Sequence, residues 1–196
     1  MKKIFLTLTI LILTFSTQIV ADTSNSIQRI YEGNKDAKVT IITYESFTCG
    51  HCADFHKNVY PQLKKEFIDA GLVKIEFRHF PLDMAALNAS KIAQCNNDGK
   101  SDILHFLFSN QKKWAIGETV ETANENLKKL LKDENIAIDF EKCTNNKNIE
   151  DYVLNDRIEG VKKFKVNATP TIIINNKKFD KPLNYKNLKK SIEKLI

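Results

Sequence analysis

The hydrophobic and polar positions of the first third of this chain predict a strand, a helix and a second strand. A β-branched apolar run at residues 39–44 predicts a buried strand, and apolar residues then recur at helical spacing. We expect Pro61 to kink or split that helix and Gly71 to end it. Residues 73–77 predict the second strand. Residues 39–78 therefore form a βαβ unit, whose crossover normally makes the two strands parallel.

The pattern then changes for about eighty residues. From about residue 83 to 166 the apolar spacing is helical, which predicts an inserted subdomain of four or five short helices. Strand character returns at residues 171–174, and a turn at 175–178 leads to a short strand at Phe179. Residues 183–195 have the spacing of a closing amphipathic helix. This order predicts an α/β domain with a helical insertion.

The N-terminus has the order of a secretory signal peptide. A lysine pair precedes an apolar run at residues 4–15, and small residues follow, ending at Ala21. The run is too short for a membrane span, which needs about 20 apolar residues. We expect residues 1–21 to be a signal peptide cleaved after Ala21, with an uncleaved anchor as the alternative. Residues 22–196 then form one domain, which begins with a polar stretch and an edge strand around Ile30.

Composition narrows the class of protein. The 196 residues are 42% hydrophobic and 28% charged, values of a globular domain. The net charge of +6 is spread along the chain with no basic patch interleaved with aromatic residues, so we expect no nucleic acid partner. The four cysteines do not form two close-spaced pairs, which argues against a zinc site. We also expect no cofactor.

The candidate chemistry lies at Cys49-Gly50-His51-Cys52, between the first strand and the helix. Backbone N–H groups and the dipole at a helix N-terminus favour a thiolate, so we expect a lowered pKa at Cys49, the exposed nucleophile. Cys52, one turn further, is the buried partner that closes the disulfide. His51 either favours the Cys49 thiolate or is an exposed histidine without a role. Gly50 either opens the approach to the sulfur or merely suits the helix start. A structural bridge and half of a zinc site remain alternatives for the pair.

Three histidines and one glutamate outside the motif are further polar residues to interpret. His56 follows Cys52 by four residues on the same helix face, and we expect it to be a packed structural residue, as we do for His79 and His105. Glu45 is either a proton acceptor for Cys52 or a solvated loop residue.

Several stretches together resemble one known family in order and spacing. They are residues 36–42, 46–52, 55–56, 80–82 and 168–171. The chain resembles the DsbA family, which has a thioredoxin fold with an inserted helical subdomain. The resemblance implies that residues 22–196 are a thioredoxin-like domain with its insertion at about 83–166. It also implies that Pro170 is a cis-proline facing the cysteines, and that Thr169 and Pro170 present an edge backbone to an extended substrate.

Two features set the chain apart from the best-known members. Gly50-His51 stands where they have Pro-His, and Thr169 stands where the strongest oxidants have an apolar residue, so we expect a milder oxidant. Cys95 and Cys143 resemble a subgroup with a second bridge in the insertion. We expect a structural disulfide between them, which closes a loop of about 48 residues and contributes about 4 kcal/mol in the chain-entropy model.

The resemblance implies an exported thiol:disulfide oxidoreductase that introduces, and is able to rearrange, disulfides in secreted or periplasmic proteins. Its partners would be unfolded or partly folded exported proteins with free cysteines, and a membrane redox partner is one option for its reoxidation. We expect a monomer in the periplasm. The alternatives are a disulfide isomerase or reductase of the same fold, and a non-catalytic exported peptide-binding or chaperone module with an inert disulfide.

Overall fold

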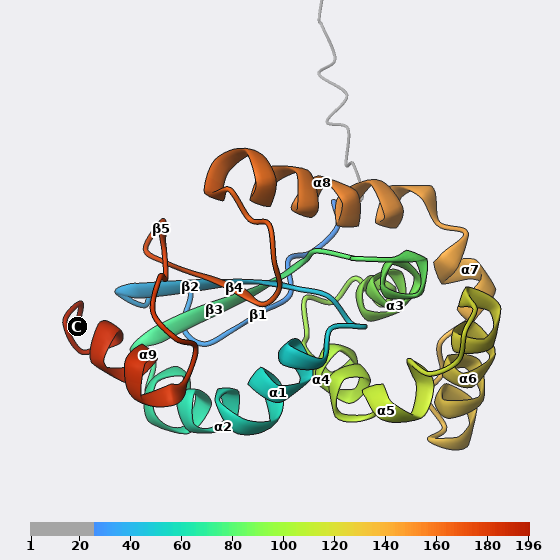
Figure 1. The fold of residues 1–196 in the computed structure, drawn as a ribbon, viewed down its shortest axis with the longest axis horizontal. Helices are drawn as coiled ribbons and strands as arrows, with labels where there is room; N and C mark the ends of the chain where they lie inside the picture. The colour runs from blue at the N-terminus through green and yellow to red at the C-terminus, as the bar shows by residue number, and fades with distance from the viewer. Residues whose placement is uncertain (1–25) are drawn as a thin grey trace, which may run out of the picture.

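The fold is described by a computed structural model, in which residues 26–196 are placed (Figure 1). The expected signal peptide at residues 1–21 lies outside the described residues. Within residues 26–196, no helix is both long and apolar enough to cross a membrane. The described chain has a central sheet with helices on both of its faces, as Figure 1 shows.

Five strands form the sheet. They are β1 (Tyr31–Glu32), β2 (Val39–Glu45), β3 (Val73–His79), β4 (Thr171–Ile174) and β5 (Lys177–Lys178). Their order is β1-β3-β2-β4-β5. β2 and β3 pair in parallel, as the βαβ pattern predicts, while the other neighbours pair antiparallel. Strand β1 is the expected edge strand.

The last strand begins earlier than the sequence predicts. Asn175 and Asn176 have φ values of 44° and 67°, so they alone form the loop between β4 and β5. A two-residue loop with positive φ at both positions matches the twist of a hairpin, and asparagine tolerates that conformation. The pairing strand is therefore Lys177–Lys178, and Phe179 follows it.

Helices make up most of the rest. They are α1 (Gly50–Asn58), α2 (Tyr60–Leu63), α3 (Met84–Gln94), α4 (Asp102–Ser109), α5 (Gln111–Trp114), α6 (Val120–Asp133), α7 (Phe140–Thr144), α8 (Lys147–Phe164), α9 (Tyr185–Ile192) and the π-helical turn η1 (Lys64–Ile68). The insertion contains six helices, α3 to α8, where four or five were expected. The difference arises because α5 and α7 have only four and five residues, too few to show a helical period of their own.

The helical segment that begins at Cys49-Gly50-His51-Cys52 is split, as the sequence predicts. Helix α1 ends before Val59, and Pro61 lies in the first turn of α2, where its missing N–H costs no hydrogen bond. The chain then leaves η1 through Gly71, whose φ of +72° suits glycine. The Gly71 N–H donates to the Ile68 carbonyl oxygen at 2.9 Å and so ends the helical segment.

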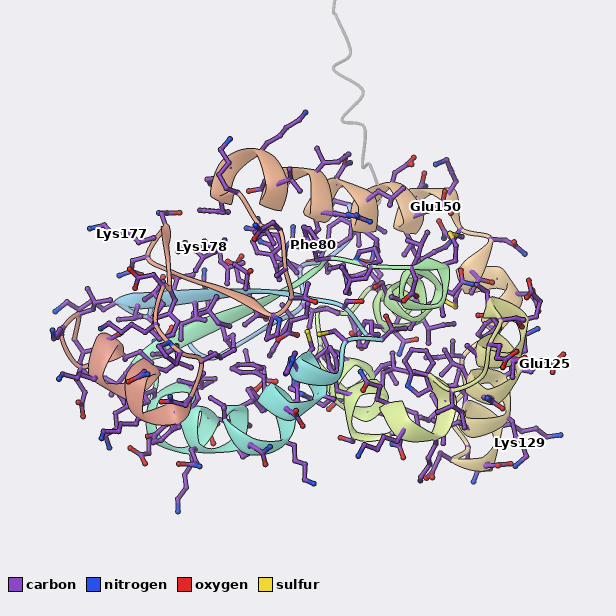
Figure 2. The ribbon with its side chains drawn as sticks, in the orientation of Figure 1. Phe80, Glu125, Lys129, Glu150, Lys177 and Lys178 are labelled. Atoms are coloured by element: carbon purple, nitrogen blue, oxygen red, sulfur yellow. A yellow bond between two sulfur atoms is a disulfide. The ribbon has the colours of Figure 1, made fainter. Side chains whose placement is uncertain are left out.

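Two packed layers hold the sheet. Helix α8 covers one face, and α1, α2 and α9 cover the other, where the main core lies (Figure 1). Neighbouring residues of β2 point to opposite faces: Ile41 packs in the main core, and Ile42 packs under α8. Phe80 lies beneath α8 as well, with its ring edge-on to Tyr44 (Figure 2). Strand β2 is therefore packed on both faces, and the start of α1 follows its end by a few residues.

Candidate active site

Cys49 and Cys52 lie at the junction of β2 and α1, and both thiols are free in this structure. Cys49 is the N-cap residue of α1 with φ −80° and ψ 117°, and Cys52 lies in the first turn. The Cys52 N–H donates to the Cys49 carbonyl oxygen at 3.1 Å. Cys49 is partly exposed, whereas Cys52 has no exposed surface. Only the first sulfur is therefore open to a partner.

The environment of Cys49 favours a thiolate. A hydrogen bond from the Cys52 thiol is the main cause, and Thr169 and the backbone N–H groups of His51 and Cys52 contribute further, against the opposing effect of burial. Together they lower the pKa of Cys49 from its ordinary 9.0 to about 5. A thiolate with this pKa is a good leaving group in disulfide exchange.

The environment of Cys52 has the opposite effect. Burial raises the pKa of its thiol well above the usual range, and the hydrogen bond with Cys49 and the charge of Glu45 raise it further. The thiol of Cys52 is therefore protonated whenever it is reduced and not engaged in exchange. The two sulfurs have distinct roles as a stable thiolate and a protonated thiol.

Thr169 and Pro170 lie beside the cysteine pair, although 120 residues separate Thr169 from Cys49 in the sequence. The Thr169–Pro170 peptide bond is cis, and the Cys49 Sγ lies 3.3 Å from the Thr169 carbonyl oxygen. A hollow of about 540 Å³ opens next to them between α1 and the start of α9. Its lining includes His51, Phe55, Val59, Thr169, Pro170 and Tyr185.

The two residues between the cysteines point to solvent. The side chain of His51 is exposed and borders that hollow, while its backbone N–H is one of the groups that stabilise the Cys49 thiolate. Gly50 is exposed, and a Cβ placed on it would meet no atom within 4 Å. The approach to the motif is open, and no contact of the fold requires a glycine there.

We expect Gly50→Pro to fold and to gain about 1 kcal/mol in free energy of unfolding, because proline restricts the unfolded chain. Gly50 is the first helical residue, where proline is favoured, and the extended conformation of Cys49 suits a residue before proline. The N–H that proline lacks is not among those that stabilise the thiolate. Urea unfolding of the oxidised proteins measures the change. A loss of stability would show that Gly50 is needed for the backbone conformation.

Cys95 and Cys143 form a disulfide with each other, and neither is bonded to the active-site pair. Cys95 follows the last residue of α3, and Cys143 is a buried residue of α7. The bridge therefore fastens two helices of the insertion away from the junction of β2 and α1.

The sequence analysis missed one residue that positions the nucleophile. The side-chain amide of Gln111, at the start of α5, donates to the carbonyl oxygens of Phe47 at 2.7 Å and Cys49 at 2.9 Å. Gln111 is buried, so these bonds replace its contacts with water. Helix α5 of the insertion thus supports the turn that carries Cys49. Gln111 lies within the polar run at residues 109–113, so nothing in the sequence distinguishes it from its neighbours.

The structure also places the three other histidines and Glu45. His56 and His79 are buried and His105 is partly buried, so all three pack within the fold. Glu45 is the last residue of β2 and only 4% exposed, so it is not a solvated loop residue. The His56 Nε2 lies 2.9 Å from the Glu45 Oε2, which brings this carboxyl group to the helix face that carries Cys52.

Comparison with known proteins agrees with this geometry. A family model described as thioredoxin matches residues 25–194. The crystal structure of alpha-DsbA1 from Wolbachia pipientis superposes with a TM-score of 0.74 and 30% identity, over 85% of this chain and 90% of that one. Disulfide bond formation protein D from Bacillus subtilis is 29% identical over 179 residues, which cover 83% of this chain and 74% of the relative.

A third relative is longer than this chain. The putative protein-disulfide oxidoreductase of Rickettsia bellii is 33% identical over 118 residues, 54% of this chain but only 46% of the relative. The chain thus matches about half the length of this relative. The family model, in contrast, extends over the sheet, the insertion and the cysteine pair, and the Wolbachia structure covers 85% of this chain. Their joint match shows that the chain belongs to the thioredoxin-fold DsbA family.

Proposed function

We propose that this protein is a thiol:disulfide oxidoreductase that introduces disulfides into exported proteins through Cys49 and Cys52. One observation carries the proposal: an accessible sulfur with a pKa of about 5 lies over a buried, protonated one, beside Thr169 and Pro170. An inert structural bridge needs neither an open sulfur nor a stabilised thiolate. The names of the relatives, which refer to disulfide oxidoreduction and disulfide bond formation, point the same way.

The exchange follows from the two environments. In the oxidised protein a substrate thiolate attacks the Cys49 sulfur, the S–S bond breaks, and Cys52 leaves and takes up a proton. A second substrate thiolate then attacks the substrate sulfur of the mixed disulfide, and Cys49 leaves as its stable thiolate. The substrate dithiol is oxidised and the cysteine pair is reduced, with two electrons transferred. The low pKa of Cys49 favours release in this second step.

The substrate site in this proposal is the hollow beside Thr169 and Pro170. Proline lacks an N–H, so the chain before β4 leaves an edge to which an extended peptide can pair, with apolar side chains resting on Phe55 and Val59. The partners are unfolded or partly folded exported proteins with free cysteines, and a membrane redox partner would reoxidise the pair. In this proposal, export rests on the signal-peptide pattern of residues 1–21, and the periplasm rests on the resemblance to the DsbA family.

The test uses a synthetic peptide with two cysteines and the oxidised protein. The wild type should oxidise the reduced peptide, and Cys49→Ala should not. Given the disulfide form of the peptide instead, Cys52→Ala should accumulate a mixed disulfide at Cys49, which forms as the peptide S–S bond breaks and which mass spectrometry identifies. Cys95→Ala/Cys143→Ala serves as the matched control, because it removes two cysteines away from the site. Oxidation of the peptide by Cys49→Ala at the wild-type rate would refute the proposal. Equilibration of the pair with glutathione then distinguishes an oxidase from a reductase.

A further inference from the structure

Four titratable side chains form a continuous chain of contacts from Glu45, at the end of β2, to Glu32 on the edge strand β1. The Glu45 Oε2 lies 2.9 Å from the His56 Nε2, the His56 Nδ1 lies 3.2 Å from the His105 Nδ1, and the His105 Nε2 lies 2.7 Å from the Glu32 Oε1. These residues come from β2, α1, α4 and β1, so the chain exists only in the folded protein. The His56 ring also stacks on Phe108, and the His105 ring stacks on Tyr60, which fixes both orientations.

The contact between the two histidines determines how many protons the chain holds. Each of the three hydrogen bonds needs one proton, but two neutral imidazoles together carry only two N–H groups. If both histidines used them on the carboxylates, two lone pairs would face each other across the Nδ1–Nδ1 contact. All three hydrogen bonds form together only when the chain holds one further proton, either as an imidazolium or as a carboxylic acid.

That proton has two positions that use the same three hydrogen bonds. In one arrangement His105 is an imidazolium, His56 donates from Nε2, and Glu45 is a carboxylate. In the other Glu45 is a carboxylic acid that donates to the His56 Nε2, and His56 donates from Nδ1 to His105. Two proton transfers along existing hydrogen bonds interconvert them, without movement of a side chain.

The inner end of the chain lies on the side of α1 that carries the buried thiol. Cys52 and His56 are one turn apart on α1, and the negative charge of Glu45 helps to raise the pKa of Cys52. The Glu45 Oε1 is buried and has no hydrogen-bond partner within the described residues, so an acceptor position is open there. The charge of Glu45 also acts to raise the pKa values of Tyr60 and His79, but neither side chain is hydrogen-bonded to it.

The outer end reaches solvent. Glu32 and Ser101 line a polar hollow of about 500 Å³. Burial raises the pKa of Glu32, but hydrogen bonds from His105, Ser101 and Tyr60 outweigh it and lower the pKa to about 2. The Lys64 Nζ, 3.4 Å from the Glu32 Oε2, adds a positive charge. Glu32 is therefore a permanent carboxylate that holds the His105 end of the chain beside water.

We propose that Glu45, His56, His105 and Glu32 form a proton relay between Cys52 and solvent. When the pair closes, the Cys52 thiol gives its proton to Glu45, its sulfur attacks Cys49 in the mixed disulfide, and His105 releases a proton at the surface. When the pair opens, the same path returns a proton to the leaving Cys52 thiolate. The inference rests on the proposed exchange, which requires Cys52 to lose and regain a proton in each cycle. His56, His105 and Glu32 are positioning residues that act through Glu45.

The test separates the two cysteines in one measurement. Stopped-flow reaction of the reduced protein with dithiodipyridine, an aromatic disulfide, releases one thiopyridone when Cys49 attacks it. A second thiopyridone is released when the Cys52 sulfur attacks the mixed disulfide at Cys49 and forms the Cys49–Cys52 bond. We expect His105→Gln and His105→Ala to leave the first phase unchanged and to slow the second by about tenfold or more, as loss of a proton-transfer group does. Imidazole should restore the second phase of His105→Ala by occupying the vacated space, but not that of His105→Gln.

The matched control is Tyr60→Phe, which removes the 2.6 Å hydrogen bond to Glu32 but leaves the chain and the stacked ring in place. We expect both of its phases within about twofold of the wild type. A second phase at the wild-type rate in both His105 variants would overturn the relay. His56 also borders a hollow, so that result would mean that His56 exchanges protons directly with water. The relay would also be overturned if imidazole did not restore the second phase of His105→Ala, or if Tyr60→Phe slowed that phase as much as the His105 variants do. A wild type that shows no second phase would instead contradict the proposed exchange.

Discussion

Reduced protein should show a single thiol titration with its midpoint near pH 5, and Cys49 should be its source. Hydrogen bonds from Cys52 and from backbone N–H groups lower this pKa from 9.0 to about 5, while burial keeps the Cys52 thiol protonated throughout. The ultraviolet absorbance of the thiolate measures the titration directly. Cys49→Ala should abolish it, and Cys52→Ala should move the midpoint upward because the largest stabilising hydrogen bond is lost.

Cys49 should react faster than an ordinary cysteine at low pH, but at about the same rate at neutral pH. At pH 7 its thiolate fraction is about a hundredfold above that of an ordinary cysteine, but a thiolate with a pKa four units lower is about 40 to 100 times less nucleophilic, so the two effects nearly cancel. At pH 5 Cys49 is about half ionised and an ordinary thiol only about one part in ten thousand, so Cys49 should react with dithiodipyridine about 50 to 100 times faster.

The same pKa sets how the redox potential depends on pH. Reduction of the pair takes up two protons below about pH 5 and one above it, so the slope should change from about 59 to about 30 mV per pH unit there. Because the pKa of Cys49 is lowered in the folded protein, the stabilisation of the reduced form grows as pH rises from about 5 toward 9 and is lost below about 5. A midpoint near pH 9 in either measurement would contradict the proposed leaving group.

The fold and the cysteine half of the active site were accessible from the sequence because each depends on local chemistry. The run at residues 39–44 is β-branched, and Gly71 has the left-handed conformation that ends a helical segment. The position of Cys49 at a helix start follows from this order alone. Pro170 was assigned by resemblance, and its place beside Cys49 is a contact between segments 120 residues apart, which no periodicity reveals.

The supporting polar residues could not be predicted, because their roles depend on contacts between distant elements. Gln111 and Cys49 come from the insertion and the sheet domain. Glu32 and His105 meet only because β1 pairs with β3 and α4 packs against α1. His56 was expected to be a packed structural residue, and packing is indeed how the fold holds its ring. Burial alone does not indicate that both of its nitrogens are hydrogen-bonded.

Loss of the Cys95–Cys143 disulfide should cost about 4 kcal/mol in free energy of unfolding, because the bridge restricts a loop of 48 residues in the unfolded chain. That loop contains α4, α5 and α6, and α5 carries the Gln111 side chain that supports the Cys49 turn. We therefore expect the loss to appear in stability first, with the titration of Cys49 unchanged under conditions in which the protein remains folded.

The measurement needs a background in which reductant acts on one bridge only. In Cys49→Ala/Cys52→Ala, urea unfolding with and without dithiothreitol compares the same chain with Cys95 and Cys143 bonded or free, so core packing is nearly constant. Cys95→Ala/Cys143→Ala in that background should lose a further 1 kcal/mol or so, because Cys143 is buried and its sulfur leaves a small cavity. A difference below about 1 kcal/mol between the bonded and free forms would show that the insertion already restricts its own unfolded chain, so that the bridge adds little to the stability of the fold.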